Sequence, residues 1–416
     1  MATAFESIRR RLRAVRPHQR RAFHLSQIDQ LETRILPTAT VSFTGTLLTI
    51  TGDTSGNEVL VERVGTQLHV AGENATVINV LGSNVSDFYF PLKTSFNFNA
   101  TFQGGDDRLR VIGGLDLRSV NIAMGDGENF VSLYNTALSG KLTIKSGIGQ
   151  DTVSLFSVSV ISNTLIDTGA DNDFVEINEG KFIGSTTITT GLGCDDVRIG
   201  NVEASSRVKF VGKLTITTGD DRDFVRMQIA ESKAFSIDTG NGRDDVFIDD
   251  VRTFGSVTVK TGEGEDSVSV SELFQTGSAT NLFDLGTDRD ELSLAVCVFA
   301  GSTTLNLGSG SCQLCCIDDV MFNQTFTLNT QGDQDRIKVE RNAGYGGATT
   351  FSKPAKFNLG PSNTVKFGLA DPASSVRFLS SVSLTGQSLQ STLYVVVANV
   401  SFASPPVLNN VVRINV

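Results

Sequence analysis

A short sequence pattern recurs eleven times between residues 103 and 339, with a spacing near 22 residues. It reads Gly-x-Gly-x-Asp-x-Φ-x-Φ, where Φ is aliphatic, and clear copies are SGIGQDTVSL (146–155), TGNGRDDVFI (239–248) and TGEGEDSVSV (261–270). A fixed period of this length is typical of chains that stack one structural unit on the next. We therefore expect one long repeat array rather than several unrelated globular domains.

The residues after each acidic position alternate between apolar and polar. Two residues on, the pattern places Leu, Val or Ile in every copy, as at Leu109, Val175 and Ile337. Period 2 indicates a β-strand with one buried face. A second short strand precedes each Gly, as in LTI (142–144) and VTV (257–259). We predict an all-β fold, a single right-handed parallel β-helix (a solenoid) with about 22 residues per coil, its hand following from the rule for parallel crossovers.

The chain divides into four parts around this array. We expect residues 1–37 to be a basic leader or targeting segment without a fixed fold, because eight Arg face three acidic residues there. Residues 38–102 should form an N-terminal β cap and the first coils, 103–340 the regular array, and 341–416 degenerate coils with a C-terminal cap. A cap is expected because an array must cover the open end of its first coil.

One acidic position recurs at the same point of every coil. The column that the spacing selects is Asp107, Asn129, Asp151, Asp173, Asp195, Asp223, Asp244, Asp266, Asp290, Cys312 and Asp335. Two residues earlier stands Gly in seven copies and Asp in four, namely Asp171, Asp221, Asp288 and Asp333. Gly, Asp and Asn adopt a left-handed backbone most readily. We expect φ > 0 at this position in each turn.

Two interpretations of the acids remain open. In the first, each Asp caps its turn by accepting backbone N–H groups. In the second, carboxylates of adjacent coils hold Ca²⁺, which prefers six to eight oxygen ligands, because like charges stacked about 4.8 Å apart need a counter-charge. The candidate metal ligands are the column residues other than Cys312, together with Asp171, Asp221, Asp288 and Asp333.

Two resemblances bear on these interpretations. Gly240, Gly242, Asp244 and Val246 resemble the RTX nonapeptide, whose family folds as a Ca²⁺-binding parallel β-roll; the doubled Gly and the second motif per coil are absent here. The Arg-rich leader followed by LETRILP (31–37) and VSFTGTLLTITGD (41–53) resembles the start of secreted or cell-surface β-repeat proteins of planctomycete bacteria. That resemblance implies location in the cell envelope or outside the cell.

Charge and cysteine content limit the function classes. Beyond residue 37 the chain is strongly acidic, which argues against a nucleic-acid partner, and no run of 18 apolar residues predicts a membrane span. Cys297, Cys312, Cys315 and Cys316 lie close together in sequence, but their spacing matches neither a zinc site nor a disulfide framework. Buried thiols or one local disulfide are the simpler interpretation.

The array gives little sign of catalysis. Its acids repeat with the coil, and residues 103–340 contain no His, whereas a hydrolytic site needs clustered, non-repeating acids and bases. We expect a non-enzymatic structural or adhesive module, secreted or in the cell envelope, stabilised by Ca²⁺ at its turns. A cell-surface polymer or other envelope proteins are its expected partners. The alternative is a carbohydrate-active enzyme of the polysaccharide lyase or hydrolase kind.

Overall fold

The computed structural model describes residues 36–415, except 93–94, 202–205, 311–312, 341–346, 369–374, 389 and 396–398. The chain divides into two units, Met1–Leu36 and Pro37–Val416. The predicted leader lies outside the described residues except for its last two positions, and so does Cys312. The second unit is all-β, with 40 strands in one continuous sheet and no α-helix among its described residues. None of the described residues forms a helix long and apolar enough to span a bilayer.

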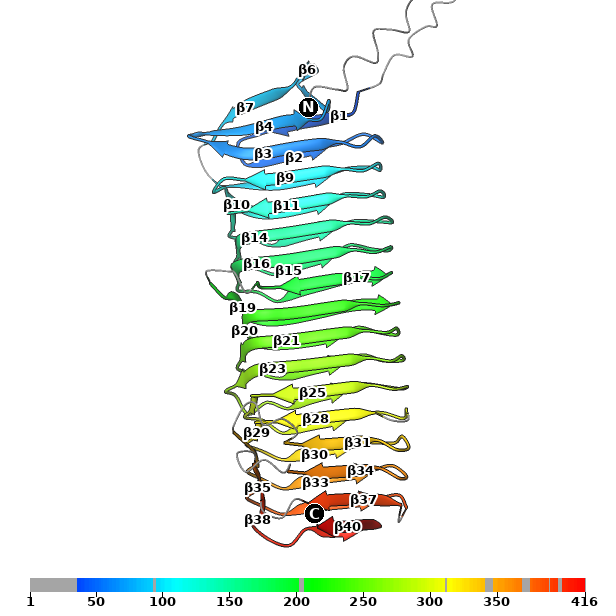
Figure 1. The fold of residues 1–416 in the computed structure, drawn as a ribbon. Coiled ribbons are helices and arrows are strands. Elements are labelled where there is room, and N and C mark those ends of the chain that lie inside the picture. The colour runs from blue at the N-terminus through cyan, green and yellow to red at the C-terminus, as the bar shows by residue number, and fades with distance from the viewer. Residues whose placement is uncertain are drawn as a thin grey trace, which may run out of the picture. The chain divides into compact units, whose positions relative to one another are not determined.

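Most strands pair in parallel with a strand one repeat away, so they form three ladders (Figure 1). The first, here the turn-following ladder, starts after each Gly/Asp turn. Its strands are β3 (Glu58–Val64), β9 (Arg108–Ile112), β11 (Phe130–Tyr134), β14 (Thr152–Val160), β16 (Phe174–Phe182), β18 (Asp196–Ile199), β20 (Phe224–Asp238), β21 (Asp245–Thr253), β23 (Ser267–Gln275), β25 (Glu291–Ala295), β28 (Leu314–Asp318), β31 (Arg336–Val339), β34 (Thr364–Phe367), β37 (Ser391–Val395) and β40 (Val411–Asn415).

The turn-preceding ladder ends at each Gly/Asp turn. Its strands are β2 (Leu47–Thr51), β8 (Phe96–Thr101), β10 (Asp116–Ala123), β13 (Leu142–Lys145), β15 (Thr164–Asp167), β17 (Thr186–Leu192), β19 (Val208–Asp220), the end of β20, β22 (Val257–Lys260), β24 (Asn281–Asp284), β27 (Thr303–Asn306), β30 (Phe326–Asn329), β33 (Ala355–Leu359), β36 (Val382–Gly386) and β39 (Val407–Asn409).

A third ladder lies between the other two along the chain. It contains β12 (Ala137–Leu138), β26 (Val298–Phe299), β29 (Met321–Phe322), β32 (Ala348–Phe351), β35 (Ser375–Phe378) and β38 (Val400–Phe402), together with parts of the longer strands β10, β14, β16, β19, β20, β21 and β23. This third strand was not predicted from the sequence, because it is short and its alternation is weak.

A second left-handed corner separates the turn-following ladder from the third ladder. It falls six residues after the acidic column in most repeats, and non-Gly residues there have φ between 47° and 56°. These residues are Asn135, Ser157, Glu179, Ile229, Asp250, Glu272, Val296 and Asp319. Because a non-Gly residue in this region costs roughly 1 kcal/mol, neighbouring repeats must hold the corner in place through their pairing.

The N-terminal strands differ from the array because several of them pair antiparallel. β1 (Thr38–Phe43) pairs antiparallel with β2, and β4 (Gln67–Glu73) pairs antiparallel with both β3 and β7 (Asp87–Pro91). β5 (Val77–Val80) pairs antiparallel with β6 (Ser83–Val85). At the other end, parallel pairing continues through β40, although the turn motif fades after residue 340. The inward positions there remain apolar, so the ladders persist without the motif.

Inward-facing residues stack on their equivalents in the next repeat. The predicted columns are buried, as at Val131, Val175 and Val225. The third ladder adds a stack of Phe rings, each nearly parallel to the next, with centroids 4.7–5.5 Å apart along Phe299, Phe322, Phe351, Phe378 and Phe402. Stacked rings at this spacing add about 0.5–1.5 kcal/mol per pair beyond the burial of apolar area.

We predict that Phe351→Ala destabilises the protein by about 3–5 kcal/mol, because Phe351 is 1% exposed and its loss leaves a cavity within the stack. Phe254→Ala is the matched control, since Phe254 is 57% exposed and should change the free energy of unfolding by only about 0.5 kcal/mol. Guanidinium unfolding of both variants measures the difference. Equal effects would mean that the Phe stack does not stabilise the fold.

Candidate functional site

The acidic column lies inside the molecule, at the start of the turn-following ladder. Its nine described Asp residues have exposed fractions between 0% and 3%. They are Asp107, Asp151, Asp173, Asp195, Asp223, Asp244, Asp266, Asp290 and Asp335. Carboxylates are rarely buried to this extent without a partner.

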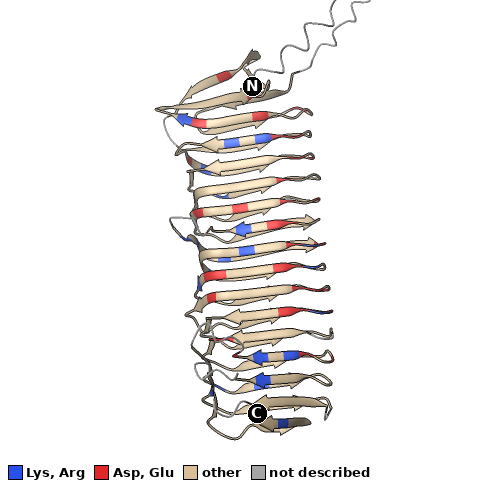
Figure 2. Cartoon of the chain, in the orientation of Figure 1, with Lys and Arg blue, Asp and Glu red and all other residues tan. Residues whose placement is uncertain are grey.

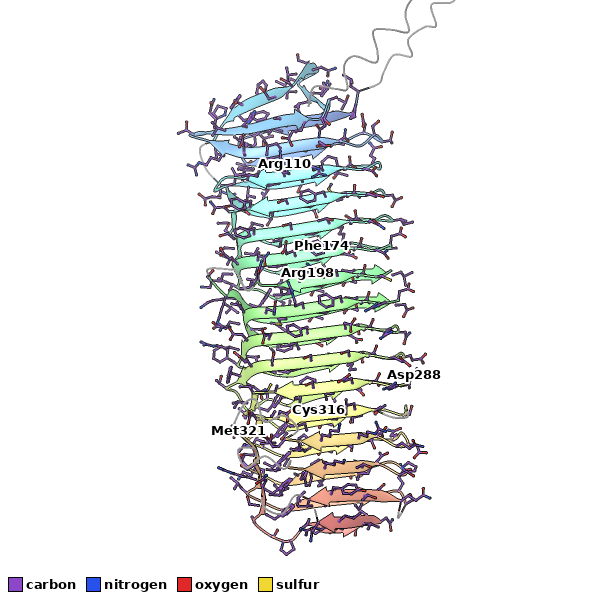
Figure 3. The ribbon with its side chains drawn as sticks, in the orientation of Figure 1. Arg110, Phe174, Arg198, Asp288, Cys316 and Met321 are labelled. Atoms are coloured by element: carbon purple, nitrogen blue, oxygen red, sulfur yellow. The ribbon has the colours of Figure 1, made fainter. Side chains whose placement is uncertain are left out.

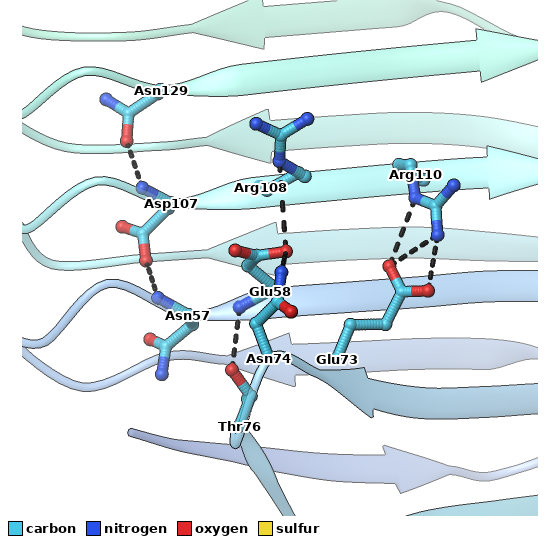
Figure 4. Close-up of polar contacts among 9 residues, drawn as sticks. All are labelled: Asn57, Glu58, Glu73, Asn74, Thr76, Asp107, Arg108, Arg110 and Asn129. Carbon is cyan, nitrogen blue, oxygen red and sulfur yellow. Dashed lines mark hydrogen bonds and ion pairs between the residues drawn. The ribbon is translucent and has the colours of Figure 1, made fainter. Parts of the chain in front are cut away.

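One hydrogen bond recurs from repeat to repeat and joins these residues into a ladder. The backbone N–H of each member donates to Oδ1 of the equivalent side chain in the next repeat, as from Asp151 to Asp173 (2.8 Å) and from Asp173 to Asp195 (2.8 Å). Figure 4 shows the first steps, where Asn57 N–H donates to Asp107 (2.6 Å) and Asp107 N–H donates to Asn129 (3.0 Å). We call this arrangement the aspartate ladder.

The main chain completes the ladder. The residue after each member donates its N–H to the carbonyl of the member in the previous repeat, as from Phe174 to Asp151 (2.8 Å) and from Phe224 to Asp195 (2.8 Å). Each ladder residue therefore connects to its neighbours through both backbone and side chain. The interpretation of the acids as turn caps gains a specific form here, because the N–H that each one caps belongs to the adjacent repeat.

The ladder is longer than the predicted column, and its register differs at one repeat. Asn57 begins it, and Asp335 N–H donates to Asn363 (2.9 Å) near its end. The position predicted for Cys312 belongs to Gln313, because Leu314 N–H donates to the Asp290 carbonyl and Cys315 pairs with Leu292. The spacing to Asp290 was therefore misread by one residue, and Cys315 rather than Leu314 occupies the inward position. Asp290 N–H has no side-chain acceptor among the described residues.

The second carboxylate oxygen of most ladder Asp residues has no partner. Oδ2 is buried and without a hydrogen bond among the described residues at Asp107, Asp151, Asp173, Asp195, Asp223, Asp244, Asp266 and Asp290. Asn129 shows which hydrogen bonds can form at the position of Oδ2. Its Nδ2 donates to the carbonyls of Gly125 (3.2 Å) and Gly127 (3.0 Å). A carboxylate in the same register has no hydrogen to donate, so a proton or a cation is needed to complete it.

Burial also raises the pKa of the ladder carboxyls from the ordinary value of 3.8. Burial raises the pKa of Asp290 to about 8, of Asp107, Asp173 and Asp223 to about 7, and of Asp151 and Asp266 to about 6. The accepted backbone N–H opposes the rise at each of them, and side-chain hydrogen bonds oppose it further at Asp151, Asp173, Asp223 and Asp266. Neighbouring ladder carboxylates raise several of these pKa values further. The ladder therefore favours the neutral acid in the folded state.

A second polar column runs beside the ladder and was not predicted. It lies five residues earlier in the repeat and contains Thr168, Thr190, Thr218, Thr239 and Thr261, each 0% exposed. The hydroxyl of Thr218 donates to the Thr239 carbonyl (3.3 Å), and that of Thr261 donates to the Leu285 carbonyl (3.1 Å). The same hydroxyls lie close enough to the ladder to lower the pKa of Asp173, Asp223 and Asp266, although burial outweighs this effect. The recurring Thr-Gly dipeptide before each turn is the signal that could have revealed this column.

The outer acids of the Asp-x-Asp turns lie apart from the ladder. Asp171, Asp221, Asp288 and Asp333 are exposed, whereas the acids two residues later are buried. Figure 3 shows Asp288 at the turn edge of the strands. In the described part of the chain, no three His, Cys, Asp or Glu side chains come together as a ligand set. The fourteen predicted ligands are thus one buried column and four exposed turn residues, and Asn129 has both side-chain polar atoms engaged.

The predicted left-handed turn position is confirmed in most repeats. Gly105, Gly127, Gly149, Gly193 and Gly264 have φ between 92° and 133°, and Asp171, Asp221 and Asp288 have φ between 78° and 83°. Gly242, Gly310 and Asp333 do not have a left-handed φ. At Gly242 and Gly310 the reason for glycine is close approach, because a Cβ would collide with the carbonyl of Asp221 or Asp288 in the previous repeat.

Among the described cysteines, Cys194, Cys297 and Cys315 are free thiols. Cys194 is exposed, and Cys297, Cys315 and Cys316 are buried. Burial raises the pKa of Cys297 to about 12, so its thiol is a neutral core group. The interpretation of these residues as small buried thiols is confirmed for Cys297 and Cys315.

We predict that Asp223→Asn is tolerated, because the amide keeps the Oδ1 acceptor and supplies the hydrogen that Asn129 uses. Asp223→Ala should destabilise by about 1–3 kcal/mol, because the buried N–H of Asp195 loses its acceptor. Urea unfolding at pH 8 measures both, with Asp221→Asn as the control for loss of one nearby exposed charge. An unchanged stability of Asp223→Ala would show that the ladder is not stabilising.

Compared with protein-family models, curated protein sequences and solved structures, the chain gives no significant match.

Proposed function

We propose that the three ladders close into one right-handed parallel β-helix, with the aspartate ladder along one inner corner. Support comes from the parallel register of about one repeat in every ladder and from the single continuous apolar core. The hand follows from the crossover rule for parallel strands, which holds for nearly all proteins. A structure of this kind is an elongated scaffold, because each repeat contacts chiefly its two neighbours.

Its proposed role is a non-enzymatic structural or adhesive module, secreted or located in the cell envelope. The observation that carries this proposal is the use of the repeated acids, which are buried and bonded to the backbone of adjacent repeats. A carboxylate committed in this way is not accessible to a substrate as a general acid or base. The resemblance of the leader to those of planctomycete surface proteins supports the location.

Calcium is part of this proposal as a stabiliser of the turns. The unpartnered Oδ2 atoms and the turn carbonyls are hard oxygen donors of the kind that Ca²⁺ binds. The exposed carboxylates of Asp171, Asp221 and Asp288 stand near the same turns. A proton on each ladder carboxyl is the competing solution, since it supplies the missing donor without a metal. The two solutions predict opposite dependence of stability on pH.

We predict first the behaviour without metal. The folded-state pKa values of the ladder lie near 6–8, above the unfolded value of 3.8. The stability that the ladder contributes is therefore complete below about pH 4 and is lost as the pH rises through 6 to 8. In EDTA, the melting temperature should fall between pH 5 and pH 8.

Millimolar Ca²⁺ should reverse this trend if the ladder binds it, because the metal favours the ionised carboxylates. Thermal melts at pH 5 and pH 8, with EDTA, Ca²⁺ or Mg²⁺, make the measurement. A larger rise with Ca²⁺ than with Mg²⁺ at pH 8 supports Ca²⁺ at the turns. Identical curves with EDTA and Ca²⁺ at both pH values would contradict the calcium part of the proposal. Protonation of the ladder carboxyls would then remain as the explanation.

The non-enzymatic role predicts no turnover of polysaccharides. The full chain is incubated with a panel of neutral and uronate-containing polysaccharides, and the release of reducing ends and of unsaturated sugars is followed. A lyase or hydrolase used as the positive control fixes the detection limit. We expect no product above the protein-free blank. Product whose amount scales with protein and persists after repurification would contradict the proposed function and favour the carbohydrate-active alternative.

A further inference from the structure

A group of cations occupies the outward face of the turn-following ladder near its C-terminal end. Arg336 and Lys338 project from β31 and Lys366 from β34, and they line a hollow of about 360 Å³ together with Thr364 and Tyr394. The register places Lys366 directly between Lys338 and Tyr394 in successive repeats. We call these five residues the basic face, and Figure 2 shows blue segments on β31 and β34.

The cations of the basic face have no counter-charge among the described residues. None of the three forms an ion pair, and the one contact of this kind is Lys366 over the Tyr394 ring, 5.3 Å from its centroid. Lys338 and Lys366 are direct cross-strand neighbours. Like charges opposite each other on parallel strands are destabilising. An anion bound between them would remove this repulsion.

Several cations earlier in the array have a counter-charge, which the three cations of the basic face lack. Arg198 lies on the same outward face, where it bonds Oδ1 of Asp196 through Nε (2.9 Å) and stacks over Phe174, 5.2 Å from the ring centroid (Figure 3). Arg110 is paired with Glu73 (Figure 4). Every described Lys or Arg ion pair involves residues before position 251. The sequence after Glu340 holds six Lys or Arg and one acid, Asp371, which lies outside the described residues.

The chemistry of the basic face selects a carboxylate-bearing ligand. A guanidinium binds a carboxylate through two parallel N–H donors, while the two ammonium groups act as mobile point charges. The hydroxyls of Thr364 and Tyr394 line the same hollow and can bond sugar hydroxyls. A hollow of about 360 Å³ is at the small end of ligand sites. It holds one or two sugar units, and its open sheet face lets a chain continue beyond it.

We propose that the basic face binds a carboxylated polysaccharide, that is, a polymer containing uronic acid. This deepens the proposed function and rests on it for the encounter with such polymers at a cell surface. A long nucleic acid fits less well, because residues 38–340 contain 41 acidic residues against 21 Lys or Arg and would repel a polyanion that extends along the array. A short uronate segment stays within the repeats of β31, β34 and β37, where the basic face lies.

The test is calorimetric titration of the full chain with oligogalacturonate, in low and in physiological salt. The double variant Lys338→Gln/Lys366→Gln should weaken binding by roughly tenfold or more, because two charge-assisted contacts are lost. Lys233→Gln/Lys260→Gln is the matched control, with the same change in net charge away from the hollow, and should bind within about twofold of the unchanged protein. A maltooligosaccharide of equal length, which has no carboxylate, should not bind.

Each outcome is decisive. No binding by a folded wild-type chain overturns the inference and leaves the proposed function standing. Equal weakening in both double variants, or equal affinity for a sulfated glycan or duplex DNA, overturns the choice of a carboxylated polysaccharide, since attraction is then due to net charge alone. Cleavage of the oligogalacturonate with binding retained contradicts the non-enzymatic role and supports the site. Circular dichroism and melting temperature confirm that each variant remains folded.

Discussion

The hydrogen bond from a backbone N–H to the side chain one repeat away is the constraint on which the turns depend. A Gly/Asp turn leaves an N–H that the strand ladders do not reach, and Oδ1 of the next Asp accepts it, as Asp244 does for Asp223 (2.9 Å). Because the acceptor belongs to the following repeat, no single repeat can satisfy its own turn. Stacking therefore completes the hydrogen bonds of the turn as well as burying apolar area, and both effects favour long arrays over short ones.

The same bond explains why the ladder accepts Asn and Asp but changes character between them, whereas the side chain of Gln313 does not accept it. The side chain of Asn129 uses both its polar atoms, accepting a hydrogen bond through Oδ1 and donating two through Nδ2. Asp provides the same Oδ1 acceptor, but its Oδ2 has no hydrogen-bond partner among the described residues. In the proposed function, a proton or a cation supplies that missing partner. Gln313 is one methylene longer; its Nε2 reaches the Asp288 carbonyl (3.1 Å), while its Oε1 has no partner among the described residues. The proposed response of this corner to pH or cations rests on its many Asp residues, because an all-Asn ladder has no carboxyl group to titrate or to bind a cation.

Most of the interior could be predicted from the sequence because the interior is periodic. The inward columns at Val131 and Val225 and the left-handed turn at Asp171 follow from residue type at fixed spacing. The register at Gln313 did not follow, since one added residue between turn and strand is invisible to a column count anchored on Cys312. The corner at Ile229 was also missed, because its left-handed φ is imposed by neighbouring repeats and not by its side chain. Burial of the ladder was open for a related reason: capping and metal binding require the same carboxylates at the same spacing.

The outward-facing residues are constrained differently from the inward-facing ones, and they can differ more from repeat to repeat. An inward side chain must match the repeats above and below it, so substitutions there are limited by packing. For an outward-facing charged side chain the constraint is electrostatic, because like charges on neighbouring strands destabilise the sheet unless an opposite charge lies nearby. Arg198 meets it through Asp196, whereas Lys338 and Lys366 do not meet it within the described chain. Because the interior is nearly the same in every repeat, cations without a counter-charge on the surface are the more informative sign of a ligand. No feature of the fold itself explains why those cations stand together.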